Sequence, residues 1–142
     1  MGIVDTVRTI KQAHQSDVVL IKVGKFYHAY GKDAYIISFL FNYQLKKVDA
    51  NTNTTGFPEV AIDKVSKTLN EKNINYLIIN KEESEIKDFK QENKYAEIYS
   101  KAHKYQNRKN KADEIYEFLM SNIDEDGIKE KINKIEEILY DY

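Results

Sequence analysis

A short apolar run near the start of the chain limits most strongly what it can fold into. Val18–Val23 is a nearly continuous β-branched segment, which is typical of a strand buried on both faces of a sheet. Gly24-Lys25 predicts a turn, and the aromatic-rich segment Phe26–Tyr30 predicts a second strand that closes a hairpin. Such strands need helices or further strands to cover them.

The neighbouring segments supply those elements. Apolar residues at helical spacing predict three helices, at 3–14, 32–41 and 61–70. Two more strands are expected at 43–48 and 75–80, whereas the polar segment 49–56 is expected to be a loop. This order of elements predicts an α/β (α+β) fold class: a small mixed β-sheet flanked by helices.

The chain changes character after Asn80, and we therefore predict two parts. Residues 1–80 form the α/β domain, and residues 81–142 form a charged connector followed by C-terminal amphipathic helices. The connector Lys81–Lys90 is expected to be partly helical. Residues 92–140 are expected to form a helical hairpin, because two amphipathic patterns flank a break at Asn122–Gly127.

Charge is divided unequally between the two parts. Residues 1–80 hold ten Lys and Arg against seven Asp and Glu, whereas residues 81–142 hold twelve against sixteen. If nucleic acid binds, the first part is the expected surface. The chain lacks cysteine, a signal-peptide pattern and an apolar run of membrane-span length, so we expect a cytoplasmic protein without thiolate metal sites or contact with a membrane.

One segment gives a more specific indication than the composition does. Val18–Ala34 resembles the segment of the MutS DNA mismatch-repair proteins in which an apolar strand runs into a Gly-x-Phe-Tyr-Glu turn, an aromatic stretch, and an acidic residue with alanine that opens a helix. Gln44–Lys47 resembles the family's Leu-Thr-Lys-Arg strand, and Gly56–Pro58 resembles its Gly-Val-Pro turn. The chain thus resembles the N-terminal mismatch-recognition domain of MutS, domain I, over roughly half its length.

The resemblance implies a set of nucleic-acid-binding residues. Phe26 takes the place of the wedge that stacks on a mismatched base from the minor groove, where the duplex kinks. His28 stands where the family has a glutamate that accepts a hydrogen bond from the mispaired base, and Tyr27 is expected to pack inside. Lys25, Lys46 and Lys47 are expected to hold phosphates. The alternative is that Phe26 is a core aromatic and these lysines are solvated.

We therefore predict a non-catalytic DNA-binding module of mismatch-recognition type, without a cofactor, as an accessory to a larger nucleic-acid machine. The sequence has no phosphate-binding Gly-x-x-x-x-Gly-Lys-Ser/Thr motif and no nucleophile–base pair, paired acid or metal motif, which argues against an enzyme. The expected partners are DNA and, through the C-terminal helices, a protein partner or a second copy. The alternative function is a protein–protein interaction adaptor that kept the fold and lost DNA binding.

Overall fold

The computed structural model describes residues 2–80, 84–87 and 92–141. The chain forms two compact units, Met1–Gln106 and Asn107–Tyr142. Helix α4, Tyr95–Ser121, begins in the first unit and ends in the second. The domain boundary that the sequence predicts after Asn80 stays a prediction.

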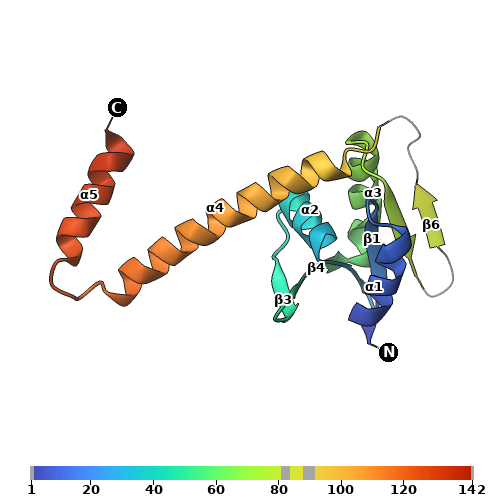
Figure 1. Cartoon of the computed structure of the whole chain (residues 1–142), viewed down its shortest axis with the longest axis horizontal. Coiled ribbons are helices and arrows are strands. Elements are labelled where there is room, and N and C mark those ends of the chain that lie inside the picture. Colours follow the sequence, from blue (N-terminus) through green and yellow to red (C-terminus); the bar gives the residue numbers. More distant parts are fainter. Residues whose placement is uncertain (1, 81–83, 88–91, 142) are drawn as a thin grey trace. The chain divides into compact units, whose positions relative to one another are not determined.

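A mixed sheet forms the centre of the first unit (Figure 1). Its six strands lie in the order β3-β4-β2-β1-β5-β6. β1 and β5 are parallel, and the other neighbouring pairs are antiparallel. The strands are β1 Val18–Val23, β2 Phe26–Tyr30, β3 Lys46–Asp49, β4 Thr52–Pro58, β5 Tyr76–Ile79 and β6 Ser84–Lys87.

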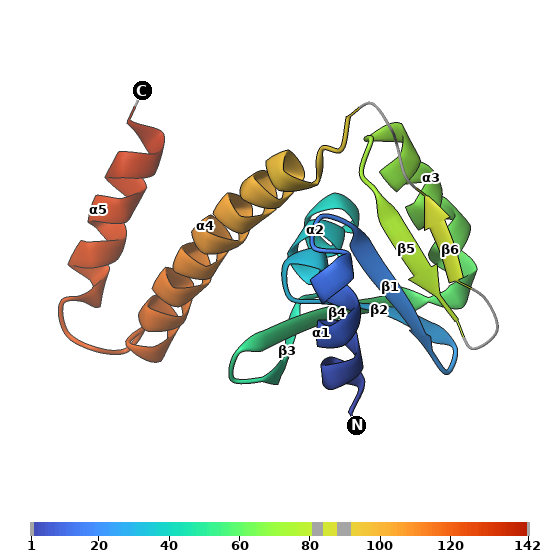
Figure 2. The same ribbon diagram turned by 45° about the vertical axis from the view of Figure 1, so that its right-hand side comes forward.

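Helices cover both faces of this sheet (Figure 2). The first unit therefore has two apolar cores. Helix α1, Ile3–Ala13, places Val7 against Val19, Ile21, Tyr30 and Leu77 on one face. The opposite face carries the larger core, to which α2 (Lys32–Phe41), α3 (Ile62–Glu71) and the start of α4 contribute. A short 3-10 helix, η1 Glu59–Ala61, precedes α3. The predicted fold class is therefore confirmed.

The central strand β1 explains why both faces must be covered. Val18 and Leu20 lie in the larger core, whereas Val19 and Ile21 lie in the core beneath α1. All four side chains are buried, as a continuous apolar run predicts. The predicted hairpin with β2 is also confirmed, with Val23 paired to Phe26.

The predicted polar loop at 49–56 is wrong, because most of it belongs to β4, an inner strand of the sheet. Two of its threonines donate to neighbouring backbone: Thr54 donates to the carbonyl of Ala29 in β2, and Thr55 donates to that of Gln44, which precedes β3. Because threonine is β-branched and finds these acceptors only after the strands pair, its polarity alone is a poor guide here.

Two further predictions need correction. The strand expected at 43–48 is β3, Lys46–Asp49, and Tyr43 instead stacks on Phe57 with ring centroids 5.6 Å apart. Within the connector expected to be partly helical, Ser84–Lys87 forms β6, which pairs with β5. Pairing with β5 makes this segment a strand, and its charged sequence gives no sign of that pairing. The rest of the connector, 81–83 and 88–90, lies outside the described residues.

The second unit consists of the end of α4 and helix α5, Ile128–Tyr140. The break between them is the one that the sequence predicts, and Gly127 adopts a left-handed φ of 87° immediately before α5. The helical hairpin is thus confirmed. Within the described part of the chain, every helix is too short or too polar to cross a membrane.

One buried carboxylate joins four elements of the first unit. Asp33, in the first turn of α2, is 1% exposed. It accepts hydrogen bonds from the Val19 amide of β1 (3.0 Å), the Lys11 ammonium of α1 (3.1 Å) and the Tyr95 hydroxyl of α4 (2.5 Å). Burial raises the pKa of Asp33, and the charge of Lys11 opposes that shift. A carboxylate in this position is stable only while its donors are present.

We expect Tyr95→Phe to lower the free energy of unfolding by about 2 kcal/mol, because a buried charged acceptor loses its closest donor while the ring stays in place. Urea denaturation followed by circular dichroism measures this change. Tyr116→Phe is the matched control: Tyr116 is 63% exposed and should change stability by less than about 0.5 kcal/mol. Equal urea midpoints for the two variants would show that the hydrogen bond from Tyr95 to Asp33 contributes nothing to stability.

Candidate functional site

Strand β2 separates its side chains onto the two faces of the sheet. Tyr27 and Ala29 point into the larger core, and Tyr27 is 6% exposed, which confirms the prediction that it packs inside. Phe26, His28 and Tyr30 follow one another along the opposite face, with neighbouring ring centroids 6.5 and 6.3 Å apart. Tyr30 lies in the core beneath α1, whereas Phe26 is 47% exposed.

Phe26 is not the only apolar residue exposed at this end of the sheet. The strand register places Val23 of β1 on one side of it and Pro58 of β4 on the other. Val23 and Pro58 are exposed as well. We call these three residues the apolar tip. Paired residues of adjacent strands present their side chains on the same face, so the tip is one continuous surface.

The turn that carries the tip is anchored by Glu59 of η1. The Glu59 amide donates to the carbonyl of Lys25 (2.9 Å), and its carboxylate lies 2.7 Å from the ammonium of Lys22. Lys22 and, to a smaller extent, Lys25 lower the pKa of Glu59, which is ionised at neutral pH. Gly24 takes a left-handed φ of 64° in the turn, a conformation that suits glycine. The backbone beside Phe26 is therefore held from two sides.

A stack of aromatic rings supports the opposite face. Tyr27 stacks on Phe57 with centroids 5.9 Å apart, and Phe57 stacks on Tyr43. Phe57 is fully buried. These closely packed rings give the tip a rigid support directly behind it.

His28 lies over the backbone of Gly56, its partner in β4. A Cβ at position 56 would come within 2.8 Å of the imidazole Nδ1, so only glycine leaves room for the ring in this position. Burial lowers the pKa of His28, which makes the neutral imidazole the main form at neutral pH. That form offers one donor and one acceptor, whereas a carboxylate offers only acceptors.

The three lysines that were expected to hold phosphates do not lie on one face of the sheet. Lys46 of β3 pairs with Thr54 of β4, and Thr54 pairs with Tyr30, so Lys46 belongs to the same face as Phe26 and His28. Lys47 pairs with Asn53 and belongs to the opposite face. Lys25 lies in the turn next to Phe26, and its side chain is exposed.

This arrangement offers an apolar tip, a neutral imidazole beside it, and cations around it. Val23, Gly56 and Pro58 are functional candidates that our sequence reasoning missed. Strand alternation from Phe26 and the Gly56–Pro58 segment could have pointed to them. Among the described residues, no three histidine or acidic side chains lie together as metal ligands would.

The family model of MutS domain I matches residues 1–109 of this chain. The match takes in the whole sheet, the apolar tip, His28 and the three lysines, and it ends within α4. It confirms the resemblance inferred from Val18–Ala34 and extends it over about three quarters of the chain. No curated protein matches the chain.

We expect Gly56→Ala to displace the His28 ring and to lower the free energy of unfolding by about 1–2 kcal/mol, the usual cost of forced overpacking. In a His28→Ala background most of that cost should disappear, although the new methyl would still meet the Tyr27 carbonyl at 3.2 Å. Urea denaturation of the four proteins in a double-mutant cycle measures the coupling. Strictly additive effects would mean that the ring does not lie over Gly56 in solution.

Proposed function

Because the chain belongs to the MutS domain I family, we propose that it is a DNA-binding module that recognises kinked or mismatched duplexes through Phe26. MutS domain I is a non-catalytic DNA-binding domain of mismatch-recognition type, and the chain shares this family character. In this proposal Phe26 is the wedge, the cations around it hold phosphates, and the module assists a larger nucleic-acid machine.

The observation that carries the proposal is the position of Phe26. Its ring is exposed on an anchored turn, while the next residue, Tyr27, is buried in a stack of aromatic rings. An apolar side chain inserted between base steps must unstack them, which costs a few kcal/mol and costs least at a mismatch. Contact of the bent duplex with the rest of the protein offsets this cost.

His28 supports a polar contact beside the wedge. Its ring centroid lies 6.5 Å from that of Phe26 on the same face. Neutral imidazole can accept a hydrogen bond from a base edge, as the family's glutamate does, and it can also donate one. We propose that His28 takes over the glutamate's place with a less restrictive hydrogen-bonding pattern.

The cations around the tip support contact with phosphates. Lys25 and Lys46 are exposed on or beside the face that carries Phe26, whereas Lys22 is paired with Glu59. Phosphate contacts position a protein on the duplex without reading its sequence. Two or three such contacts give weak binding that decreases as salt rises.

A second candidate function is a protein–protein interaction adaptor that kept the fold and lost DNA binding. The observation in its favour is His28, which cannot carry the negative charge of the family's glutamate. The two functions differ in one property: a DNA-binding module must bind DNA in a salt-sensitive way, and the adaptor must not.

We expect Phe26→Ala to weaken DNA binding by more than about 1 kcal/mol, the scale of one lost base–aromatic stack. Fluorescence anisotropy with perfect duplex, G·T-mismatched duplex and single-stranded DNA at low and moderate salt measures it. Tyr105→Ala, which removes a ring of almost the same exposure from α4 (46%), is the control and should bind as the parent does. Failure of every DNA to bind at low salt would favour the adaptor.

Neutralising the two neighbouring lysines of β3 should have different effects. Lys46→Gln is expected to reduce the slope of log K against log salt by about one, because one phosphate contact is lost. Lys47→Gln alters the adjacent residue on the opposite face and should leave the slope nearly unchanged. Equal effects would show that the duplex does not follow the face that carries Phe26.

A further inference from the structure

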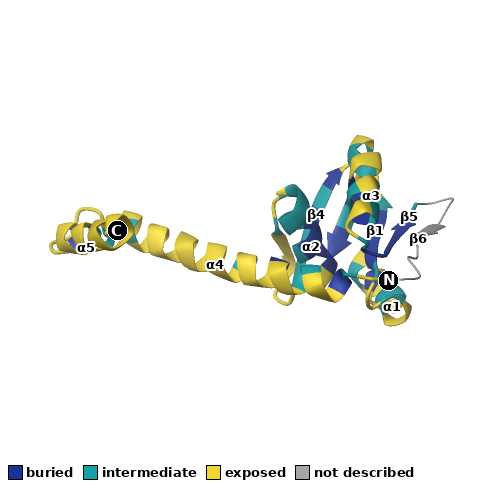
Figure 3. Cartoon of the chain, turned by 90° about the horizontal axis from the view of Figure 1, so that it is seen from above, coloured by how far each residue is buried: buried dark blue, intermediate teal, exposed yellow. Residues whose placement is uncertain are grey.

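The hairpin of α4 and α5 leaves most of its apolar side chains in solvent. In the described part of the second unit, Ile128 is the one buried large apolar residue. α5 and the end of α4 are drawn mostly as exposed in Figure 3. Eight large apolar side chains of the hairpin are at least 45% exposed: Ile115, Tyr116, Phe118, Met120, Ile123, Ile138, Leu139 and Tyr140.

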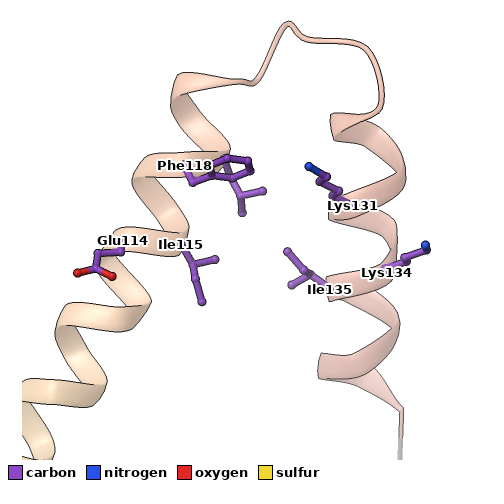
Figure 4. Close-up of a pocket in the computed structure, with 7 residues that line it drawn as sticks. Glu114, Ile115, Phe118, Lys131, Lys134 and Ile135 are labelled. Atoms are coloured by element: carbon purple, nitrogen blue, oxygen red, sulfur yellow. The ribbon is translucent and has the colours of Figure 1, made fainter.

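The two helices also leave an open groove between them, with a volume of about 420 Å³. Ile115 and Phe118 of α4 face Ile135 of α5 across this groove (Figure 4). Lys131 reaches over the Phe118 ring, with its ammonium 5.2 Å from the ring centroid. Two helices alone cannot close such a groove, whereas helix bundles close it by adding helices whose apolar stripes meet at the centre.

Summed over both helices, the exposed apolar side chains approach the area that one partner buries in a standard interface. Eight half-exposed large side chains present on the order of 600–800 Å², given that an aromatic side chain can bury about 150–250 Å². A standard interface buries about 800 Å² on each partner.

The charges of α5 indicate which partner fits. In its first half Lys129, Lys131 and Lys134 outnumber Glu130, whereas its second half carries Glu136 and Glu137 and is followed by Asp141. This order opposes the helix dipole, which favours negative charge at the start of a helix and positive charge at its end. Among the described residues of the hairpin, no ion pair between α4 and α5 uses these charges.

We propose that the partner is a second copy of this chain, whose α5 packs antiparallel to the first. In an antiparallel pair the basic half of each α5 lies opposite the acidic half of the other, so the unfavourable order within one helix becomes favourable between two. A symmetric interface requires this self-complementarity. This dimer is a property separate from the proposed DNA binding, and its formation does not require DNA.

Three isoleucines of α5 have the same symmetry. Ile132 and Ile138 lie three residues before and after Ile135. In an antiparallel pair centred on Ile135, Ile132 of one copy meets Ile138 of the other, and the two Ile135 side chains meet at the two-fold axis. This pairing covers Ile138, which is 77% exposed in the single chain.

Sedimentation equilibrium of the full chain without DNA tests the proposal, and we expect a monomer–dimer equilibrium in the micromolar range. Ile138→Lys should weaken the dimer at least about tenfold, because it buries an unpaired charge, without unfolding a monomer in which the side chain is exposed. Val60→Lys is the matched control, since Val60 is an apolar residue of the first unit that is 88% exposed. A monomer at every concentration, or a particle of more than two chains, would overturn the proposal.

Charge exchange tests the antiparallel order directly. An acidic variant carries Lys129→Glu, Lys131→Glu and Lys134→Glu, and a basic variant carries Glu136→Lys and Glu137→Lys. Each variant alone should be monomeric, and an equal mixture should form a one-to-one heterodimer. Circular dichroism checks that both keep their helices. Homodimers of either variant, or a mixture that remains monomeric, would refute the pairing of unlike halves. All of these measurements omit DNA, so their outcome is independent of the Phe26 experiment.

Discussion

The Asp33 carboxylate holds the first unit together. An ion of this kind is unstable in an apolar interior unless several donors surround it, and its donors come from α1, β1 and α4. The arrangement therefore selects one placement of these elements around the start of α2. It also includes the first residue of α4, whose hydroxyl remains protonated because burial and the nearby carboxylate raise the pKa of Tyr95. The sheet that displays Phe26 is positioned by the same cluster, through the Val19 amide.

The candidate site follows from this scaffold by the alternation of side chains along strands. Once the inner side of β2 is fixed by Tyr27 and Ala29, Phe26 and His28 must point to the other side. α1 covers that side over β1 and β5, and the part that carries Phe26 and Pro58 stays exposed. An exposed phenylalanine is thus a consequence of strand register and of where α1 packs.

Much of this could be predicted from the sequence, because its strongest signals are local. The apolar run at β1, the hairpin to β2 and the breaks around the helices depend on neighbouring residues, and all were found. β4 and β6 were missed, since their polar sequences become strands only through pairing with β2 and β5. The site was found in part for the same reason. Phe26 and His28 stand out in a motif, but Lys46 and Lys47 could be assigned to faces only from the register with β4, and the role of Gly56 required the position of the His28 ring.

Strand β3 has a consequence for how copies of the chain can meet. It forms one border of the sheet, and a bare border offers unpaired backbone groups to any other strand. Here that border carries two lysines and an aspartate in four residues, and the register shifts between Lys47 and Asp49. Charge and an irregular backbone both discourage a second strand from adding there, which protects the β3 border of the sheet from aggregation.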